Sequence, residues 1–240
     1  NVPLLRGYNV AHDDWADQLG VRTLRGLFCL GGLPRSWHKE LQQHARDAGL
    51  QFLSTPFSVD AARFLVEEIG VPFLKIASGD LTFFPLLQYA NSIATPVILS
   101  TGGATVADIG RAVGALQRQY DAGTLALLHC RSIYPCPPGA VQLRAIEYLL
   151  HSYPLATPGW SDHTTDMLIP SMALCVGARI IEKHLSLADG IGVDARHSLW
   201  PIQFAEMVEG LRETTIMLGE ATKTPHPGEM HDRLWARRDP

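Results

Sequence analysis

The feature that most constrains the fold is a repeat of short apolar segments, each followed by a stretch with helical spacing of apolar residues. Six segments have the length of a β-strand, and they lie at 51–57, 73–78, 96–101, 125–130, 158–163 and 179–184. Alternation of strand and helix is typical of βαβ units, in which the strands pair in parallel and the helices cover the sheet. The sequence therefore predicts an α/β protein with a parallel sheet.

The stretches between these segments carry helix signals. In residues 105–120, Val106 and Ile109 fall on one stripe, Thr105 is a suitable N-cap and Gly123 is a suitable end. Further helices are expected at 36–49, 58–70, 85–94 and 202–218.

Polar side chains gather at the carboxyl ends of the six predicted strands. They are Ser54, Thr55, Lys75, Ser78, Ser100, Thr101, His129, Ser161, Asp162, His163, Glu182, Lys183 and His184. Both (β/α)₈ barrels and open doubly wound sheets bind ligands at this edge, but no G-x-G-x-x-G follows any of the strands. Polar ends on all six strands favour a ring. Residues 1–34 contain one possible strand, at 27–30, but no two clear βα units. We therefore expect an incomplete TIM barrel with about six βα units, in which the first two are missing.

Composition excludes several classes of protein. The 240 residues include 20 Lys and Arg and 24 Asp and Glu, so the formal charge is −4 and the pI is about 6.2, which argues against a nucleic-acid partner. The apolar stretch 167–178 is too short to cross a membrane. Charged residues in the first seventeen positions argue against a signal peptide, and four cysteines without a C-x-x-C pair suggest reduced thiols in the cytoplasm.

Two histidines are candidates for a metal site. Residues two apart on a strand share a face, so Glu182 lies with His184 and Ser161 lies with His163. Imidazoles at the ends of consecutive strands can converge on one cation and leave positions open for a substrate oxygen. The alternative is that each histidine forms only a local hydrogen bond.

Lys75 is unusual because it stands near the end of an apolar strand, and a buried lysine needs a partner. It could hold a phosphate or carboxylate, form a Schiff base, or pair with Glu182 or Asp162. The hydroxyls at neighbouring strand ends could cradle a phosphate beside it, or they could merely cap turns. Asp194, in the loop after the last strand, is either a functional carboxylate or a turn residue.

Six motifs occur in an order and spacing that resemble the N-acetylneuraminate (sialic acid) synthase family over roughly residues 41–219. They are FLSTPF at 52–57, LKIASGD at 74–80, PVILSTG at 96–102, LHC at 128–130 with IYP at 133–135, SDHT at 161–164, and IEKH at 181–184.

The resemblance implies a TIM barrel followed by a small antifreeze-like domain, in a domain-swapped homodimer. It implies condensation of phosphoenolpyruvate with an N-acylated aldose, typically N-acetylmannosamine or its 6-phosphate, to a nine-carbon 2-keto-3-deoxy sugar acid with release of phosphate. Relatives leading to legionaminic or pseudaminic acid are equally compatible. A divalent metal, Mn²⁺ or Mg²⁺, is expected on His163 and His184.

The resemblance also implies roles for further residues. Phosphoenolpyruvate is expected to contact Thr55, Lys75, Ser78, Ser100 and Ser161. Ser132 and Tyr134 match substrate-pocket positions, Asp80 matches an acidic position that contacts the sugar, and Asp194 resembles the aspartate after the final strand. The expected catalytic residues are Lys75, Asp80, Glu182 and Asp194.

The chain departs from the family at both ends. It lacks the family's first strand with a Glu and an Asn-His pair, and the second strand with a lysine. We therefore expect a partial barrel domain at 1–219 and, at 220–240, a linker toward an antifreeze-like domain. A six-stranded barrel would have two open edges, so the chain is expected to associate through them or to cover the gap with residues 1–34. Two alternative functions remain. The chain could be a Schiff-base aldolase or lyase that uses Lys75, or a non-catalytic fragment of the synthase.

Overall fold

The computed structural model describes residues 20, 23, 26, 31–187, 192 and 194–236. Its strands are β1 (Leu74–Ile76), β2 (Val97–Ser100), β3 (Leu125–Cys130), β4 (Thr157–Asp162) and β5 (Ile180–Lys183). Its helices are α3 (His38–Asp47), α4 (Val59–Arg63), α5 (Phe84–Ser92), α6 (Val106–Ala115), α7 (Gln117–Asp121), α8 (Arg144–Ser152), α9 (Leu168–Cys175), α10 (Pro201–Leu218) and α11 (Met230–Ala236). None of these helices is long and apolar enough to cross a membrane.

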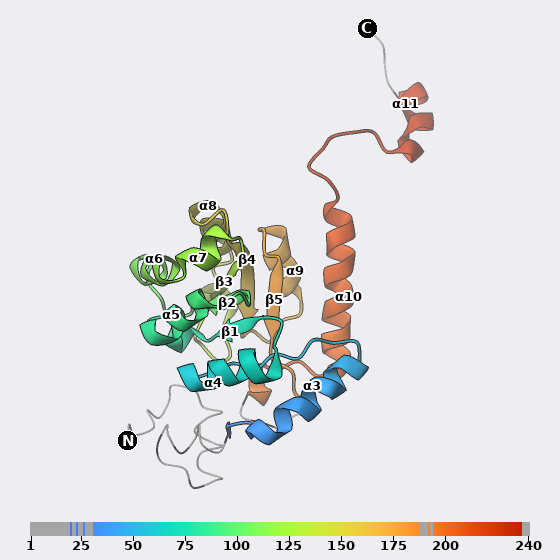
Figure 1. The fold of residues 1–240 in the computed structure, drawn as a ribbon. Coiled ribbons are helices and arrows are strands. Elements are labelled where there is room, and N and C mark those ends of the chain that lie inside the picture. Colours follow the sequence, from blue (N-terminus) through green and yellow to red (C-terminus); the bar gives the residue numbers. More distant parts are fainter. Residues whose placement is uncertain are drawn as a thin grey trace.

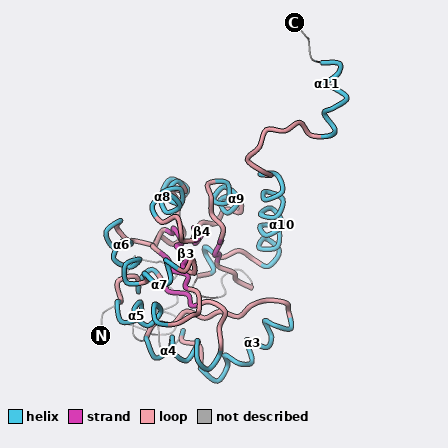
Figure 2. The backbone as a smooth tube through the Cα atoms, turned by 45° about the horizontal axis from the view of Figure 1, so that its top comes forward, coloured by secondary structure: helices cyan, strands magenta, loops and turns pink. Residues whose placement is uncertain are grey.

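The described strands form one parallel sheet in the order β1-β2-β3-β4-β5. The sheet is curled, and the helices between the strands lie around its outside (Figures 1 and 2). This is the architecture of an incomplete (β/α) barrel, as the sequence predicts. β1 and β5 are the edges of the sheet as far as the described residues go.

The strand predicted at 51–57 is wrong: these residues are irregular as far as Ser58, which caps α4. The described part of the chain therefore has five strands rather than six. An apolar pattern indicates burial, but a strand also needs a neighbouring strand with which its backbone forms hydrogen bonds. The nearest strand in the sequence is β1, which is only three residues long and pairs with β2 rather than with residues 51–57. The possible strand at 27–30 lies outside the described residues.

The helix signals are mostly confirmed. The Ser58 side chain accepts a hydrogen bond from the Ala61 amide, and Thr105 and Asp108 form a capping box at the start of α6. Gly70, with φ of 69°, ends the π-helical segment Phe64–Ile69 that continues α4. The helix predicted at 105–120 is divided into α6 and α7, because the backbone at the buried Leu116 leaves helical geometry (φ −104°, ψ 25°).

The segment predicted to be a linker, 220–240, contains a short 3₁₀ turn (Pro227–Glu229) and helix α11. Figure 1 shows α10 leading away from the sheet toward α11. The domain boundary at 219 stays a prediction.

The main core lies between the sheet and the helices. Leu74, Ile76, Leu99, Leu125 and Leu127 are all buried in it, and they alternate along the strands with residues that face the inner side. The inner side carries Lys75, Ser100, Ser161 and Glu182. Alternation with a period of two thus gives a mainly apolar outer face and brings these polar side chains together on the inner face.

Gly159 allows β4 to pack closely between its neighbours. A Cβ atom at this position would lie 2.8 Å from the Ile180 carbonyl oxygen and would collide with the Leu128 side chain. We expect Gly159→Ala to lower the free energy of unfolding by about 1–3 kcal/mol, because the neighbouring backbone has no room to move. Urea denaturation measures the change.

Gly114→Ala is the matched control. This glycine lies in α6 with nothing within 4 Å of the added Cβ, and alanine should raise stability by up to about 1 kcal/mol. Equal effects of the two substitutions would contradict the close packing of β4.

Candidate active site

A chain of polar contacts crosses the inner face near the carboxyl ends of the strands. The Lys75 ammonium lies 3.4 Å from Glu182 Oε2, and the Ser161 hydroxyl donates to Glu182 Oε1 at 2.7 Å. Lys75 and Ser161 are buried, whereas 42% of the Glu182 side chain is exposed. The sequence left Glu182 and Asp162 as possible partners of Lys75, and in the structure the partner is Glu182. The alternation of side chains explains this, since Asp162 faces the helices.

A second group of polar atoms surrounds Gly102, just beyond β2. The Gly102 amide donates to Ser78 Oγ at 2.9 Å, and Ser78 Oγ lies 3.2 Å from Cys130 Sγ. A Cβ at Gly102 would come within 3 Å of Ser78 Oγ, Cys130 Sγ and Ser132 Oγ. The absence of a side chain at Gly102 therefore lets two predicted site hydroxyls, Ser78 and Ser132, approach the same point.

The two predicted metal-binding histidines are neighbours. The ring centroids of His163 and His184 lie 5.3 Å apart, and Tyr134 packs on His163 at 4.3 Å. His184 Nδ1 lies 3.5 Å from Asp194 Oδ2, which brings the predicted loop aspartate into the same cluster. His184, Asp194 and His197 form a group whose possible ligand atoms all lie within 4.8 Å of one another.

The backbone orients the ring of His163. Its Nδ1 lies 2.7 Å from the Arg131 carbonyl oxygen, to which it donates in the tautomer that this acceptor requires. Nε2 is then the nitrogen with a lone pair. Metal-binding histidines are commonly held in this way, with the second ring nitrogen on a carbonyl or carboxylate.

Burial lowers the pKa of His163 and of His184, although Asp194 opposes the effect at His184. Burial, together with the nearby His184, lowers the pKa of His197 to about 4. Near neutral pH the three rings are therefore uncharged, which is the form that binds a metal ion. The group of His184, Asp194 and His197 fits a divalent cation, and the nitrogens of His197 have no hydrogen-bond partner among the described residues; His163 lies beside this group but is not part of it.

A buried ion pair lies directly behind this cluster. Lys183 Nζ is 2.9 Å from Asp162 Oδ2, and both side chains are 0% exposed. Lys183 also donates to the Thr164 carbonyl, and Asp162 Oδ1 accepts from the Thr164 amide at 2.8 Å. The pair joins the ends of β4 and β5 immediately before His163 and His184.

Other predicted site residues are less connected. Ser100 is buried and its hydroxyl has no hydrogen-bond partner within the described residues. Asp80 lies in the 3₁₀ turn Ser78–Asp80, where burial raises the pKa of its carboxyl and Oδ2 is unpartnered in the described structure. Thr55 is half-buried in the loop before α4, and the described structure brings it into no hydrogen bond with the other candidates.

Sequence reasoning missed His197. It lies three residues after Asp194 in a loop that had no recognisable pattern, and its ring packs 4.5 Å from His184 and 5.1 Å from Tyr134. The sequence signal that could have found it is the position of His197 only three residues after Asp194, which was already a candidate site residue.

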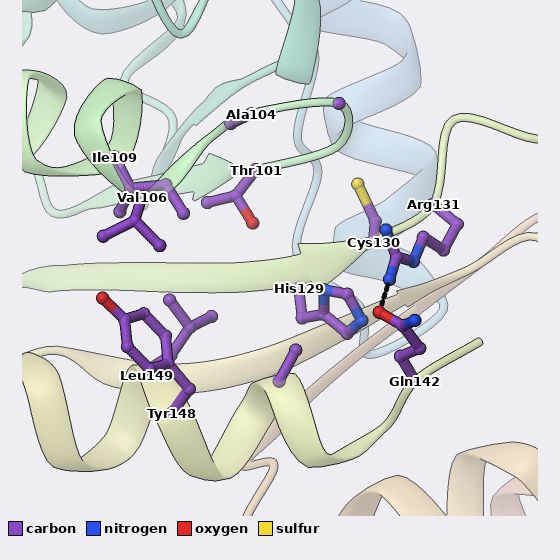
Figure 3. A pocket seen from close by; sticks show the side chains of 12 residues that line it. Thr101, Ala104, Val106, Ile109, His129, Cys130, Arg131, Gln142, Tyr148 and Leu149 are labelled. Atoms are coloured by element: carbon purple, nitrogen blue, oxygen red, sulfur yellow. Dashed lines mark hydrogen bonds between the residues drawn. The ribbon is translucent and has the colours of Figure 1, made fainter. Parts of the chain in front are cut away.

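A cavity of about 370 Å³ lies elsewhere, between α6 and α8. Thr101, Val106 and Ile109 line one side, and His129 and Tyr148 line the other (Figure 3). His129 packs against Trp160 with its Nε2 3.0 Å from the Val141 carbonyl, so it faces the helices. The cavity therefore lies mainly on the helix side of β3, and Cys130, which contacts Ser78, lies at its edge.

The comparisons with known proteins agree with one another. The family model that matches, over residues 11–223, is that of the NeuB family. An uncharacterized protein of Methanocaldococcus jannaschii is 40% identical over 200 residues, which are 83% of this chain and 58% of that protein. An N,N'-diacetyllegionaminic acid synthase of Legionella pneumophila is 34% identical over 205 residues, which are 84% of this chain and 57% of that enzyme.

A solved structure is similar over most of the chain. The N-acetylneuraminic acid (sialic acid) synthetase from Leptospira borgpetersenii, crystallised with citrate, superposes with a TM-score of 0.82 at 29% identity. The match covers 94% of this chain and 77% of that one. The chain spans less than three fifths of the two curated relatives, at 58% and 57% of their lengths.

The ion pair between Asp162 and Lys183 gives a stability prediction. Asp162→Asn would leave a fully buried ammonium without its carboxylate, and we expect a loss of about 3–5 kcal/mol in urea denaturation. Replacing both residues, as Asp162→Leu with Lys183→Met, should cost less than the single change. Glu209→Gln, which removes half of an exposed pair with Arg212, is the control and should have no measurable effect. If Asp162→Asn lowered the stability no more than Glu209→Gln does, the stabilising role of the buried ion pair would be refuted.

His129 gives a pH prediction away from the histidine cluster. Burial lowers the pKa of His129 below its ordinary 6.5, so the unfolded state binds more protons once the pH falls through that value. Stability should therefore fall progressively as the pH drops below about 6.5. His129→Gln should make the loss shallower, while the exposed-site control His151→Gln should not. The same slope in all three proteins would contradict the role of His129.

Proposed function

Because the chain belongs to the NeuB family, we propose that it is the barrel portion of a synthase that joins phosphoenolpyruvate to an N-acylated aldose. The product is a nine-carbon 2-keto-3-deoxy sugar acid, and phosphate is released. The observation that carries the proposal is the convergence of a buried lysine, a row of hydroxyls and a histidine cluster on one inner face.

Lys75 and the hydroxyls are proposed to hold phosphoenolpyruvate. The Lys75 ammonium would face the phosphate or carboxylate, and Ser78, Ser100 and Ser161 would donate hydrogen bonds to its oxygens. The unpartnered hydroxyl of the buried Ser100 supports this, since a buried polar atom normally has a partner. Thr55 and Ser132 complete the proposed set of phosphoenolpyruvate and pocket contacts.

Glu182 has a positioning role in the proposal. It accepts from Ser161 and lies beside Lys75, so it orients the two groups that face the phosphate. Asp80 is proposed to contact a sugar hydroxyl, and Tyr134, packed on His163, forms a wall for the sugar. The open-chain aldehyde would lie between these residues and the histidines.

His163 and His184 would hold a divalent cation, Mn²⁺ or Mg²⁺. The cation would supply Lewis-acid polarisation of the aldehyde oxygen. Asp194, beside His184, would hold a sugar hydroxyl or a water in place. Lys75 and the surrounding hydroxyls would stabilise negative charge on the phosphate as it leaves.

The bond changes balance with water as the third reactant. The enol carbon of phosphoenolpyruvate attacks the aldehyde carbon, which forms the new carbon–carbon bond. Water adds at the carbon that bears the phosphate, and the resulting tetrahedral centre expels inorganic phosphate to leave the keto group. The protein contributes position and charge rather than a covalent intermediate.

A Schiff-base aldolase using Lys75 is the alternative enzyme. Lysine nucleophiles are activated in apolar pockets or beside another cation, whereas Lys75 lies beside a carboxylate. Borohydride reduction with pyruvate separates the two, because the synthase should form no covalent adduct. A non-catalytic fragment would show no coupled binding of phosphoenolpyruvate and Mn²⁺ in calorimetry.

The assembly and compartment are also proposals. The family resemblance supports a homodimer, and β1 and β5, the edges of the described sheet, are where pairing with another chain would occur. The free thiols of Cys130, Cys136 and Cys175 are compatible with a cytoplasmic protein.

His184→Ala in the full protein should abolish metal-dependent condensation, because it removes one of the two proposed ligands. Phosphate release from phosphoenolpyruvate and N-acetylmannosamine measures turnover, and a chelator should have the same effect on the unmodified protein. The exposed-site variant His151→Gln is the control. Turnover that persists through both treatments would overturn the metal assignment.

A further inference from the structure

The buried side chain of His197 has no assigned role. It is 0% exposed, and neither ring nitrogen has a hydrogen-bond partner within the described residues. Burying an unpaired polar group costs about 1–3 kcal/mol, so native proteins rarely leave both nitrogens of an imidazole in this state. Among the described residues, the nearest charged group to His197 is the Asp194 carboxylate, 3.5 Å from Nε2, so the ring nitrogens are available to a bound ion.

The surroundings of His197 are those of a cation site. Its Nε2 lies 3.5 Å from Asp194 Oδ1, while the second oxygen of that carboxylate lies 3.5 Å from His184 Nδ1. The His197 ring centroid is 6.0 Å from that of His163. One carboxylate thus lies between two imidazoles, and a third imidazole is adjacent.

The loop is folded so that His197 returns to the strand end that carries His184. The Leu199 amide donates to the His184 carbonyl at 2.9 Å, and the Ser186 amide donates to the Leu199 carbonyl at 3.0 Å. These two bonds form the parallel bridge between Leu185 and Leu199. His197, in the 3₁₀ turn just before this bridge, is therefore positioned by backbone hydrogen bonds rather than by chance packing.

We propose that His197, together with Asp194, is a protein ligand of the divalent cation assigned to His163 and His184. The inference rests on the proposed function only for the presence of that cation. It extends the protein ligands from two imidazoles to three imidazoles and a carboxylate. Such a nitrogen-rich set favours transition metals over Mg²⁺, because imidazole suits Mn²⁺, Co²⁺ or Zn²⁺ better than it suits a hard, strongly hydrated ion.

Calorimetric titration of the full protein with Co²⁺ tests the proposal. His197→Gln should weaken Co²⁺ binding by at least about tenfold, since even indirect contacts to a metal ligand contribute that much. His151→Gln should leave the affinity unchanged, and unmodified protein should bind Co²⁺ more tightly than Mg²⁺. Co²⁺ affinity within about twofold of the unmodified protein in His197→Gln, with binding lost in His184→Ala, would overturn the role of His197 and leave the proposed function intact.

A second measurement covers the case in which His197→Gln does not fold. Histidine-¹⁵N NMR of the unmodified protein, titrated with Zn²⁺, reports which imidazole nitrogens bind the ion. Shifts at His163, His184 and His197 support the proposal, and shifts confined to His163 and His184 overturn it. No binding of any cation would refute both this inference and the metal of the proposed function. Binding through His197 without condensation would sustain the inference and refute the function.

Discussion

The pairing of β4 with β5 is the interaction on which the candidate site depends. Asp162 lies opposite Lys183 in the ladder, and their ion pair is buried on the helix side. One residue earlier, Ser161 lies opposite Glu182, and their hydrogen bond is on the inner side. A shift by one residue would break both contacts, because every side chain would move to the other face. The register that these pairs secure also brings His163 and His184 to the same level.

The inner face combines groups that would be unfavourable alone. Lys75 is acceptable near the core because Glu182 is its partner, and Glu182 is in turn held by Ser161. The same carboxylate favours the charged form of the nearby His163 and His184, yet burial outweighs it and keeps both pKa values low. A hydrogen-bonding region around the Lys75–Glu182 ion pair thus adjoins a region of neutral imidazoles. This division supports the proposed function, in which an anionic substrate binds on one side and a cation with a sugar oxygen on the other.

The candidate site was predictable wherever it depended on strand periodicity. The two-residue repeat placed Glu182 with His184 and Ser161 with His163, and the apolar strand around Lys75 indicated that this lysine is buried. The sequence could not choose between Glu182 and Asp162 as the partner of Lys75. The structure made that choice, because Asp162 faces outward and is already paired with Lys183. His197 was missed because its position depends on how the loop after β5 returns, which no local pattern encodes.

The sequence by itself determined the alternation of strands and helices, the helix caps at Ser58 and Thr105, and the edge of the sheet where the polar residues gather. These follow from local hydrogen bonding and from the periodicity of burial, which act over a few residues. Only the tertiary structure decided that residues 51–57 do not form a strand and that His197 joins His184 and Asp194. Those outcomes depend on partners distant in sequence, and backbone pairing and loop closure are properties of the assembled chain.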